Sequence, residues 1–333
     1  MTRTHHVLAL VTLLVGLAHS CEWDIALAGD NMLALLYKNG TGACFEGIGI
    51  ESDFEHLTYD IVHNRMILVD GKKTQDTLII TYNFATRKKL PLVKRNLNDR
   101  FLSSVLSLAY DPVTEILFWS DAYAIYWFSL KPGFTNNVYG NRLFSFSKYR
   151  PTSVAVDSCK GYIYWIKSES GGPSKIEKAR FDGSDREIVI EENLHDGRNL
   201  VIDQQTQKMY WTEDTTKIKP TQFIQDKQYS FQSADLNGEN RTTFYTTRNF
   251  HPRTLITSKD FIYWVYNFDL DYSLWQLPKN PTEDTRPQGI SVRGTIPFHY
   301  SIAAKYKIED QIQDIQDCEP LRSLLPKNQG TDE

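Results

Sequence analysis

The chain has 333 residues, of which 41% are hydrophobic and 23% charged, so it can bury a core and is not a disordered chain. Its formal net charge of -4 and pI near 6.1 exclude the broad basic surface that a nucleic-acid partner requires. The one local basic run, Arg87-Lys88-Lys89 followed by Lys94-Arg95, is expected to be a solvated loop.

Residues 1–20 have the pattern of a secretory signal peptide. Arg3 gives a weakly positive start, Val7–Ala18 form the apolar stretch, and small residues precede a cleavage site before Cys21. The apolar stretch is too short to span a bilayer, and no later segment approaches the length of a membrane helix. The sequence therefore predicts a secreted, extracellular protein with no membrane span.

Four cysteines follow the predicted cleavage site, and none has the close spacing of a zinc site. An even number in an oxidising compartment predicts two disulfides, with three pairings open. These cysteines are Cys21, Cys44, Cys159 and Cys318. Two Asn-X-Thr sequons further predict glycosylation at Asn39 and Asn240.

A pattern that begins near residue 56 recurs along the chain. Each copy has an apolar pair, an Asp at a turn, a few polar residues and then an aromatic-rich strand. The Asp residues of four copies are Asp60, Asp111, Asp157 and Asp203, which lie 51, 46 and 46 residues apart. That period is typical of a four-stranded propeller blade. Leu255–Trp264 forms a fifth copy.

Each part of the repeat has a structural explanation. The apolar pair is expected to form the inner strand beside a central channel, packed on both faces, and the Asp to bind backbone donors of the turn. The aromatic pair is expected to fill the space between neighbouring blades. The predicted scaffold residues are Asp60, Asp111, Trp119, Asp121, Asp157, Tyr164, Trp165, Asp203, Tyr210, Trp211, Asp214, Tyr263 and Trp264.

The two ends of the chain supply the parts of a sixth blade. Ser301–Ala304 resembles another inner strand, while Trp23–Leu27 and Met32–Leu36 offer two strands with no inner strand before them. Pairing of the C-terminal strand with the N-terminal strands would close the ring and leave no open strand edge between its first and last blades. The sequence therefore predicts an all-β, six-bladed propeller over residues 21–308, closed by N-terminal strands that join the C-terminal inner strand. A polar tail, 309–333, would follow as a tether through Cys318.

The segments 117–121 (LFWSD) and 209–214 (MYWTED) resemble the class B repeat of the low-density-lipoprotein receptor family, whose hallmark is Tyr-Trp-Thr-Asp. The resemblance covers about residues 50–305 and implies a binding protein. Lys167 and Val265-Tyr266 depart from the motif, so the repeats are degenerate.

Glu22–Asp24, Leu108–Asp121 and Val154–Trp165 are similar to an insect branch of such propeller proteins. That similarity implies a Cys159–Cys318 bridge, with Cys21–Cys44 remaining, and a developmental or germ-line role. It also implies growth-factor-like modules and a membrane span after the propeller, neither of which this sequence contains.

The resemblance implies that one face of the disc holds an extracellular protein. Aromatic residues beside acids are favoured in such contacts, and two expected loops contain them. Ordinary strand residues are the alternative, above all for Trp127 and Phe128. The candidate partner-binding residues are Tyr123, Tyr126, Trp127, Phe268, Asp269, Asp271 and Tyr272. The alternative is a carrier that holds a small hydrophobic ligand, such as a pigment, in the channel mouth.

An enzyme is the third hypothesis, and the sequence does not favour it. It contains no nucleophile elbow, zinc-protease motif or phosphate-binding glycine loop. A calcium-dependent lactonase or esterase would need Asn, Asp and Glu ligands just before the inner strands. Asn199 fits, but Ser107, Thr152-Ser153 and Arg253-Thr254 do not. We therefore expect no catalytic residue, metal or cofactor.

Overall fold

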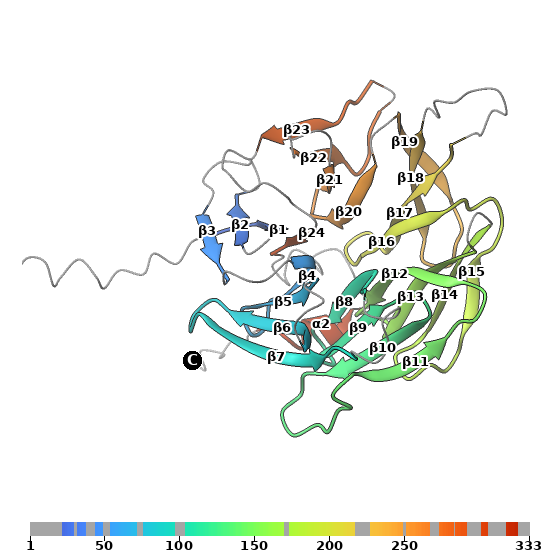
Figure 1. Ribbon diagram of the computed structural model, residues 1–333. Helices are drawn as coiled ribbons and strands as arrows, with labels where there is room; N and C mark the ends of the chain where they lie inside the picture. Colours follow the sequence, from blue (N-terminus) through green and yellow to red (C-terminus); the bar gives the residue numbers. More distant parts are fainter. Residues whose placement is uncertain are drawn as a thin grey trace, which may run out of the picture.

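The chain folds into six four-stranded sheets arranged as blades around a central channel (Figure 1). The computed structural model describes residues 22–29, 32–37, 44–48, 54–71, 76–96, 104–169, 173–216, 227–248, 251–266, 273–282, 284–291, 301–305 and 318–325. The predicted signal peptide, Cys21 and Asn39 lie outside these residues. Within them, no helix is long and apolar enough to cross a membrane.

Blades 1, 2 and 3 follow one another along the chain, each with its first strand next to the channel. Blade 1 contains β4 (Phe54–Asp60), β5 (Arg65–Asp70), β6 (Thr77–Asn83) and β7 (Lys88–Lys94). Blade 2 contains β8 (Ser107–Asp111), β9 (Ile116–Ser120), β10 (Ala124–Ser129) and β11 (Asn141–Ser145). Blade 3 contains β12 (Arg150–Asp157), β13 (Tyr162–Ser168), β14 (Ser174–Arg180) and β15 (Glu187–Ile190).

Blades 4 and 5 repeat this order, and blade 6 combines the two ends of the chain. Blade 4 contains β16 (Gly197–Asp203), β17 (Lys208–Asp214), β18 (Gln228–Asp235) and β19 (Thr242–Arg248). Blade 5 contains β20 (Pro252–Thr257), β21 (Phe261–Tyr266), β22 (Ser273–Pro278) and β23 (Gln288–Ser291). Blade 6 contains β24 (Ser301–Ala304), β1 (Ile25–Gly29), β2 (Met32–Leu36) and β3 (Cys44–Gly47).

The predicted closure of the ring is confirmed. Strand β24 pairs antiparallel with β1, with Leu27 opposite Ile302, so the C-terminal inner strand completes a sheet of N-terminal strands. The third N-terminal strand, β3, was not predicted. It is only four residues long and has no run of apolar residues. A short edge strand of this kind carries little pattern.

Aromatic side chains of the second strand of a blade lie between neighbouring blades. In blade 3, Trp165 is completely buried against Phe118 of blade 2, whereas the adjacent Tyr164 packs against Leu200 of blade 4. Consecutive residues of a strand point to opposite faces of its sheet. One Tyr-Trp pair therefore joins a blade to both of its neighbours.

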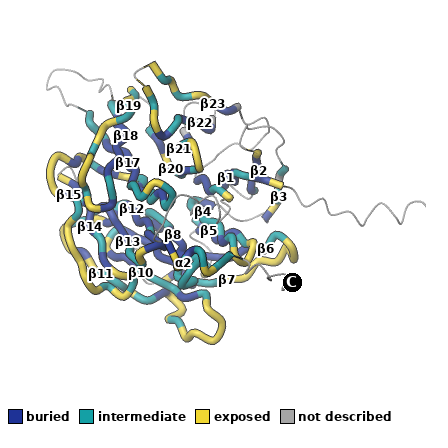
Figure 2. The backbone as a smooth tube through the Cα atoms, turned by 180° about the vertical axis from the view of Figure 1, so that it is seen from behind, coloured by how far each residue is buried: buried dark blue, intermediate teal, exposed yellow. Residues whose placement is uncertain are grey.

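The inner strands differ from the expectation that they would be packed on both faces. Several channel-lining residues are only half-buried, among them Asn199, Val201 and Ile202 of β16 and Thr254 and Ile256 of β20. Figure 2 shows the burial of inner and outer strands along the tube. The inner strands border a hollow, and each contributes a polar residue to its lining.

The repeated Asp residues close the turns between the first two strands of a blade. Asp60 Oδ1 accepts the backbone N–H groups of Val62 (3.1 Å) and His63 (3.2 Å). Asp157 is completely buried, and its Oδ1 accepts the N–H of Cys159 at 3.0 Å. These turns lie on one face of the disc, which we call the turn face. The opposite face, where each inner strand begins, is the mouth face.

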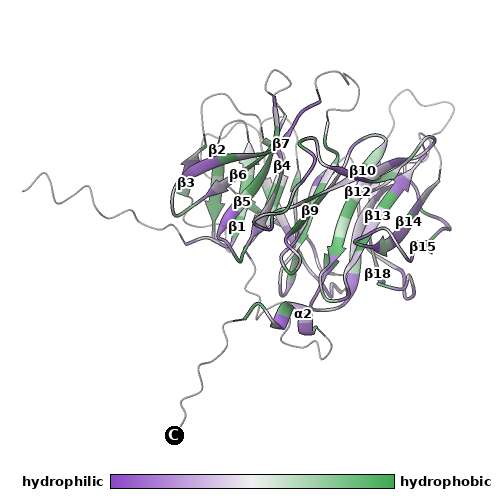
Figure 3. Cartoon of the chain, turned by 90° about the horizontal axis from the view of Figure 1, so that it is seen from below, coloured by the Kyte–Doolittle hydropathy of each residue, from purple (hydrophilic) through white to green (hydrophobic). Residues whose placement is uncertain are grey.

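A short helix, α2 (Glu319–Arg322), lies below the turn face (Figure 3). A disulfide joins Cys159 of blade 3 to Cys318, immediately before this helix. Leu321 is completely buried in the same cluster, against which Ile61 and Val113 pack from the turns of blades 1 and 2. The C-terminal segment is therefore attached to three successive blades. Cys44 is also disulfide-bonded.

The basic run of blade 1 is not a loop, so that expectation was wrong. Lys88–Lys94 is β7, the outermost strand of its blade. Lys88 and Lys89 are exposed, whereas Val93 is completely buried. An outer strand tolerates lysines because its side chains reach water and discourage edge-to-edge pairing.

Candidate functional site

The mouth of the channel is lined by one polar residue from every blade. In each inner strand this residue directly precedes the apolar pair, and all six line the same cavity, which has a volume of about 260 Å³. The six are His56, Ser107, Ser153, Asn199, Thr254 and Ser301. Among the described residues that line the cavity, none is a carboxylate or a basic side chain apart from this histidine.

Three serines of this ring join neighbouring blades. Each hydroxyl accepts the backbone N–H of the first apolar residue in the next blade's inner strand. The bonds run from Leu57 N to Ser301 Oγ (3.3 Å), from Val154 N to Ser107 Oγ (3.0 Å) and from Leu200 N to Ser153 Oγ (2.8 Å). The serines therefore satisfy backbone donors that the channel would otherwise leave unpaired.

Asn199, the candidate calcium ligand, also joins blades. Its Nδ2 donates to Thr212 Oγ1 at 3.0 Å and to the Pro252 carbonyl of blade 5 at 2.9 Å. No group of three or more His, Cys, Asp or Glu side chains within the described residues could hold a metal ion. Calcium prefers carboxylates, so the donor set at this mouth does not fit a calcium-dependent hydrolase.

The imidazole of His56 is neutral at physiological pH. Removal of its ring from water lowers its pKa to about 4, and a hydrogen bond to the backbone of Val105 opposes this shift. A neutral histidine beside hydroxyl and amide groups provides hydrogen-bonding capacity without charge. The channel mouth is therefore polar and uncharged.

The channel does not suit a hydrophobic ligand well. Its volume is below the range of about 300–1,000 Å³ that is usual for small-molecule sites. Two buried polar atoms that belong to lining residues, Thr254 Oγ1 and Gln204 Oε1, have no hydrogen-bond partner among the described residues. A small hollow with such atoms is suited to ordered water.

A charged segment of unusual conformation lies beside the channel mouth on blade 4. We call residues 193–199 the mouth loop. Three of its non-glycine residues have positive φ: Asn193 at 54°, Asp196 at 39° and Asn199 at 57°. Asn and Asp adopt left-handed backbone more readily than other non-glycine residues, and surrounding contacts offset the remaining cost.

A buried ion pair provides those contacts. Glu213 is only 2% exposed, and its carboxylate accepts the backbone N–H of His195 at 3.2 Å and binds Arg241 at 2.6 Å. The guanidinium of Arg241 also donates to the carbonyls of Glu192 (2.9 Å) and Asn193 (2.8 Å). The MYWTED segment was expected to be scaffold only. This anchor was not predicted, because Arg241 lies 28 residues beyond Glu213 in the chain, in the turn before β19.

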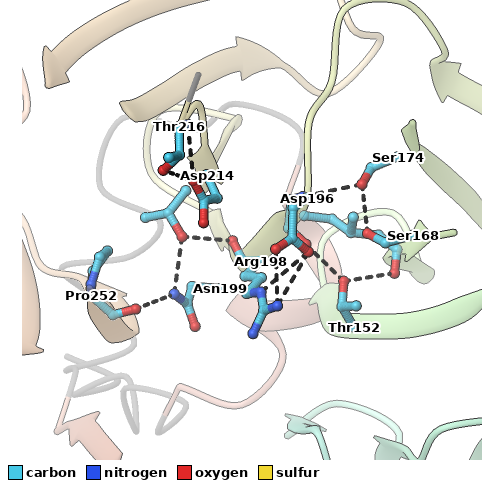
Figure 4. A network of polar contacts seen from close by, with 12 residues as sticks. Thr152, Ser168, Ser174, Asp196, Arg198, Asn199, Asp214, Thr216 and Pro252 are labelled. Carbon is cyan, nitrogen blue, oxygen red and sulfur yellow. Dashed lines mark hydrogen bonds and ion pairs between the residues drawn. The ribbon is translucent and has the colours of Figure 1, made fainter. Parts of the chain in front are cut away.

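The outer part of the mouth loop presents a charged pair to solvent. The Arg198 guanidinium binds the Asp196 carboxylate at 3.0 Å, with 47% and 43% of the two side chains exposed. Behind them, Thr152 of blade 3 donates to the Gly197 carbonyl at 2.8 Å. Figure 4 shows this pair between contacts to blades 3 and 5. The loop is thus fixed from both sides.

His251 lies near this charged pair. Its ring meets Tyr229 edge-on with 4.9 Å between ring centres. Burial lowers the pKa of His251 to about 4, with smaller contributions from the positive charges of Arg198 and Arg253. The imidazole is therefore neutral, and the charges of the mouth loop are those of its Asp and Arg.

The predicted partner-binding residues lie elsewhere. Tyr123 is 43% exposed on the mouth face of blade 2. Tyr126 and Trp127 belong to β10, so they follow the strand alternative and not the loop expectation. Tyr126 stacks on Trp119 at 5.4 Å, and burial raises its pKa to about 12. The other four, Phe268, Asp269, Asp271 and Tyr272, lie outside the described residues.

One of the two sequons, that of Asn240, lies among the described residues and is exposed to solvent. Asn240 is exposed in the turn that follows β18, where its Nδ2 donates to Asp235 Oδ2 at 2.6 Å. Glycosylation at Asn240 and Asn39 stays a prediction.

Comparisons with known proteins agree with this architecture. Residues 161–204 match the family described as low-density lipoprotein receptor repeat class B. Protein cueball of Drosophila yakuba is 26% identical over 283 residues, and that of Drosophila sechellia 30% identical over 287. Each alignment covers 83% of this chain but 41% of the relative, so the chain spans less than half the length of these relatives.

Among solved structures, a chain of a nidogen/laminin complex has a TM-score of 0.61 at 14% sequence identity. The match covers 85% of this chain and 98% of that chain, and at this identity it shows the fold alone. With six closed blades, a class B repeat match and cueball relatives, the chain is a cueball-like β-propeller of the low-density-lipoprotein-receptor class B repeat type.

Proposed function

We propose that this propeller is a secreted, non-enzymatic protein that holds an extracellular protein partner on its mouth face, centred on the mouth loop. The observation that carries the proposal is the exposed Asp196–Arg198 pair on a loop that is fixed in left-handed conformation. A binding surface that is already ordered loses little entropy when its partner arrives. Charges held in fixed positions also select for a partner of complementary charge.

The contacts of Glu213 and Arg241 beneath the mouth loop support a role in partner binding. Contacts of the buried Glu213 and the partly buried Arg241 with the backbone of residues 192–195 hold the left-handed segment in place. Backbone strain that is maintained by surrounding contacts is found preferentially at binding and active sites. The polar, carboxylate-free channel beside it favours binding over hydrolysis.

Extracellular location is part of the proposal. It is supported by the apolar segment before Cys21, by the Cys159–Cys318 disulfide and by the class B repeat match. N-terminal sequencing of protein collected from the medium of insect cells should begin at Cys21. Retention of residues 1–20, or of the whole protein inside the cells, would contradict it. The domain limits, 21–308 and 309–333, and a developmental or germ-line role are proposed with it.

The direct test is affinity capture with a matched pair of variants. The full protein is immobilised and exposed to insect body fluid, and bound proteins and small molecules are both identified by mass spectrometry. The test variant is Asp196→Ala/Arg198→Ala. The control is Arg180→Ala/Asp185→Ala, which removes an exposed Arg–Asp pair of 3.3 Å from the turn face of blade 3.

A protein captured by the wild type and the control but lost with the test variant supports the proposal. Equal capture by all three proteins overturns the assignment to the mouth loop. Capture of a planar hydrophobic molecule without a protein would favour the carrier hypothesis instead. Calcium-dependent hydrolysis of a lactone or ester by the purified protein would overturn the non-enzymatic assignment.

A further inference from the structure

We propose a second binding site, in a groove between blades 1 and 2, that takes an acidic peptide segment of a partner protein. The inter-blade groove is a hollow of about 600 Å³ beside the ends of β7 and β11, two blades away from the mouth loop. The lining residues that matter to the argument are Leu78, Lys94, Trp119, Tyr126, Tyr139 and Arg142.

The floor of the inter-blade groove is aromatic. The rings of Trp119 and Tyr126 are stacked, with 5.4 Å between centres and 13° between planes. Tyr139, which is 47% exposed, lies in the segment that connects β10 to β11 and lines the same groove. This segment comes so close that a Cβ on Gly140 would overlap the Trp119 indole. The floor is therefore formed by contact between the segment and the blade.

The walls of the inter-blade groove are positively charged. Lys94 of blade 1 and Arg142 of blade 2 are both exposed, and neither forms a salt bridge with a described residue. The guanidinium of Arg142 lies 5.8 Å from the centre of the Tyr126 ring, which holds it at the groove. Two cations from different blades thus face one aromatic surface.

The carboxylate that lines this groove does not cancel the charge. Asp121 is 4% exposed, and its Oδ1 accepts the backbone N–H groups of Tyr123 (2.7 Å) and Ala124 (2.8 Å). Burial raises the pKa of Asp121. Arg142 acts against this shift, so Asp121 offsets part of the charge of Arg142. Because Asp121 is buried and bonded to the turn of its own blade, the exposed charges of the groove are those of Lys94 and Arg142.

The combination favours a peptide over a sulfated glycan. A highly sulfated chain is bound by a long row of cations, and only Lys94 and Arg142 are exposed cations in this lining. Stacked aromatic rings with the aliphatic Leu78 instead provide an apolar surface for a side chain. An acidic segment that contains an aromatic residue would use both features, since carboxylates pair with the cations and the ring packs on the floor.

The test measures binding of a labelled peptide, acetyl-Glu-Glu-Tyr-Glu-Glu-amide, to the full protein by fluorescence anisotropy. The peptide Lys-Lys-Tyr-Lys-Lys and a heparin-derived oligosaccharide are compared under the same conditions. Arg142→Ala and Lys94→Ala are the test variants. Lys131→Ala is the control, because this exposed lysine starts the same β10–β11 segment but does not line the groove.

We expect the acidic peptide to bind, each test variant to weaken binding about two- to fivefold, and the Lys131→Ala control to match the wild type. Affinity should fall as salt is added. Asp196→Ala/Arg198→Ala should leave peptide binding unchanged, which separates this site from the mouth loop. Absence of peptide binding, equal binding by the test variants, or preference for heparin would each overturn the proposal. Thermal unfolding checks that every variant is folded.

Discussion

The ammonium group of Lys279 in blade 5 lies 2.5 Å from the carboxylate of Asp203 in blade 4, and 5% and 6% of these side chains are exposed. The same carboxylate closes its own turn by accepting the backbone N–H of Gln205 at 3.3 Å. One Asp of the repeat therefore serves both its own blade and the contact with the next. A buried pair of this kind is costly to break by removal of one partner.

Lys279→Met should lower the free energy of unfolding by about 3–5 kcal/mol, because it leaves the Asp203 carboxylate buried without its counter-charge. Chemical denaturation followed by tryptophan fluorescence measures this loss. Lys148→Met is the control, since Lys148 pairs with Glu169 at 3.1 Å but is 63% exposed. The control should lose less than about 1 kcal/mol. Equal losses of unfolding free energy in the two variants would contradict the idea that burial makes the Lys279–Asp203 pair costly to break.

Removal of the Cys159–Cys318 bridge by Cys159→Ser/Cys318→Ser should destabilise the propeller. The bridge spans 159 residues of sequence, and loop-closure entropy for this length corresponds to at most about 5 kcal/mol. Thermal unfolding measures the loss. Hydrogen exchange over residues 318–325 should rise more than over the inner strands, because the described contacts of α2 are with the turns. Unchanged exchange there would mean that Leu321 holds the helix without the bridge.

Gly140→Ala should destabilise the protein more than Gly133→Ala. Both glycines have similar positive φ, 84° and 80°, so both variants carry the same backbone cost of about 1–2 kcal/mol. A Cβ at Gly140 also meets the Trp119 ring, whereas nothing lies within 4 Å at Gly133. Overpacking adds about 1–3 kcal/mol at Gly140. Denaturant midpoints compare the two, and equal midpoints would contradict the tight approach to Trp119.

Stability should fall as the pH is lowered from about 6.5 toward 4. Burial lowers the pKa of His56 and of His251 to about 4 in the folded protein, against 6.5 in the unfolded chain. Between these values the unfolded state binds more protons, so acid favours unfolding, by up to about 3 kcal/mol for each histidine. Denaturation at pH 7, 6, 5 and 4.5 measures the slope. His56→Gln and His251→Gln should each flatten it, and an unchanged slope would refute this cause.

The sequence was sufficient to predict the ring because its blades repeat. The Asp of each turn and the aromatic pair of the next strand recur with a nearly constant period, so blade number and closure followed from local pattern. The mouth loop and the inter-blade groove could not be predicted in this way, because they depend on contacts between residues that are distant in the sequence. Glu213 and Arg241 meet across a sheet, and Gly140 reaches Trp119 only when the β10–β11 segment folds back.

Tyr126 and Trp127 illustrate the same limit. Aromatic residues that follow a repeat motif can be mistaken for an exposed loop. The register of β10 with β9 instead places Tyr126 opposite Trp119. Successive side chains of a strand point to opposite faces of the sheet, and this alternation decides which aromatic ring lies at the floor of the groove. The amino-acid composition of the segment does not. The half-buried inner strands differ from expectation for a related reason: the width of the channel is a property of the whole ring.

The pairing of β1 with β24 has a consequence for how the protein is made. Ala26 lies opposite Ala303, so β1 must wait for a strand that is translated after the other five blades. Until then β1 has a free edge, and nascent chains with unpaired edges are prone to associate with one another. The final contact also joins residues of great sequence separation, which is a slow step. Chaperone demand during synthesis should therefore be greatest just before Ser301–Ala304 emerges from the ribosome.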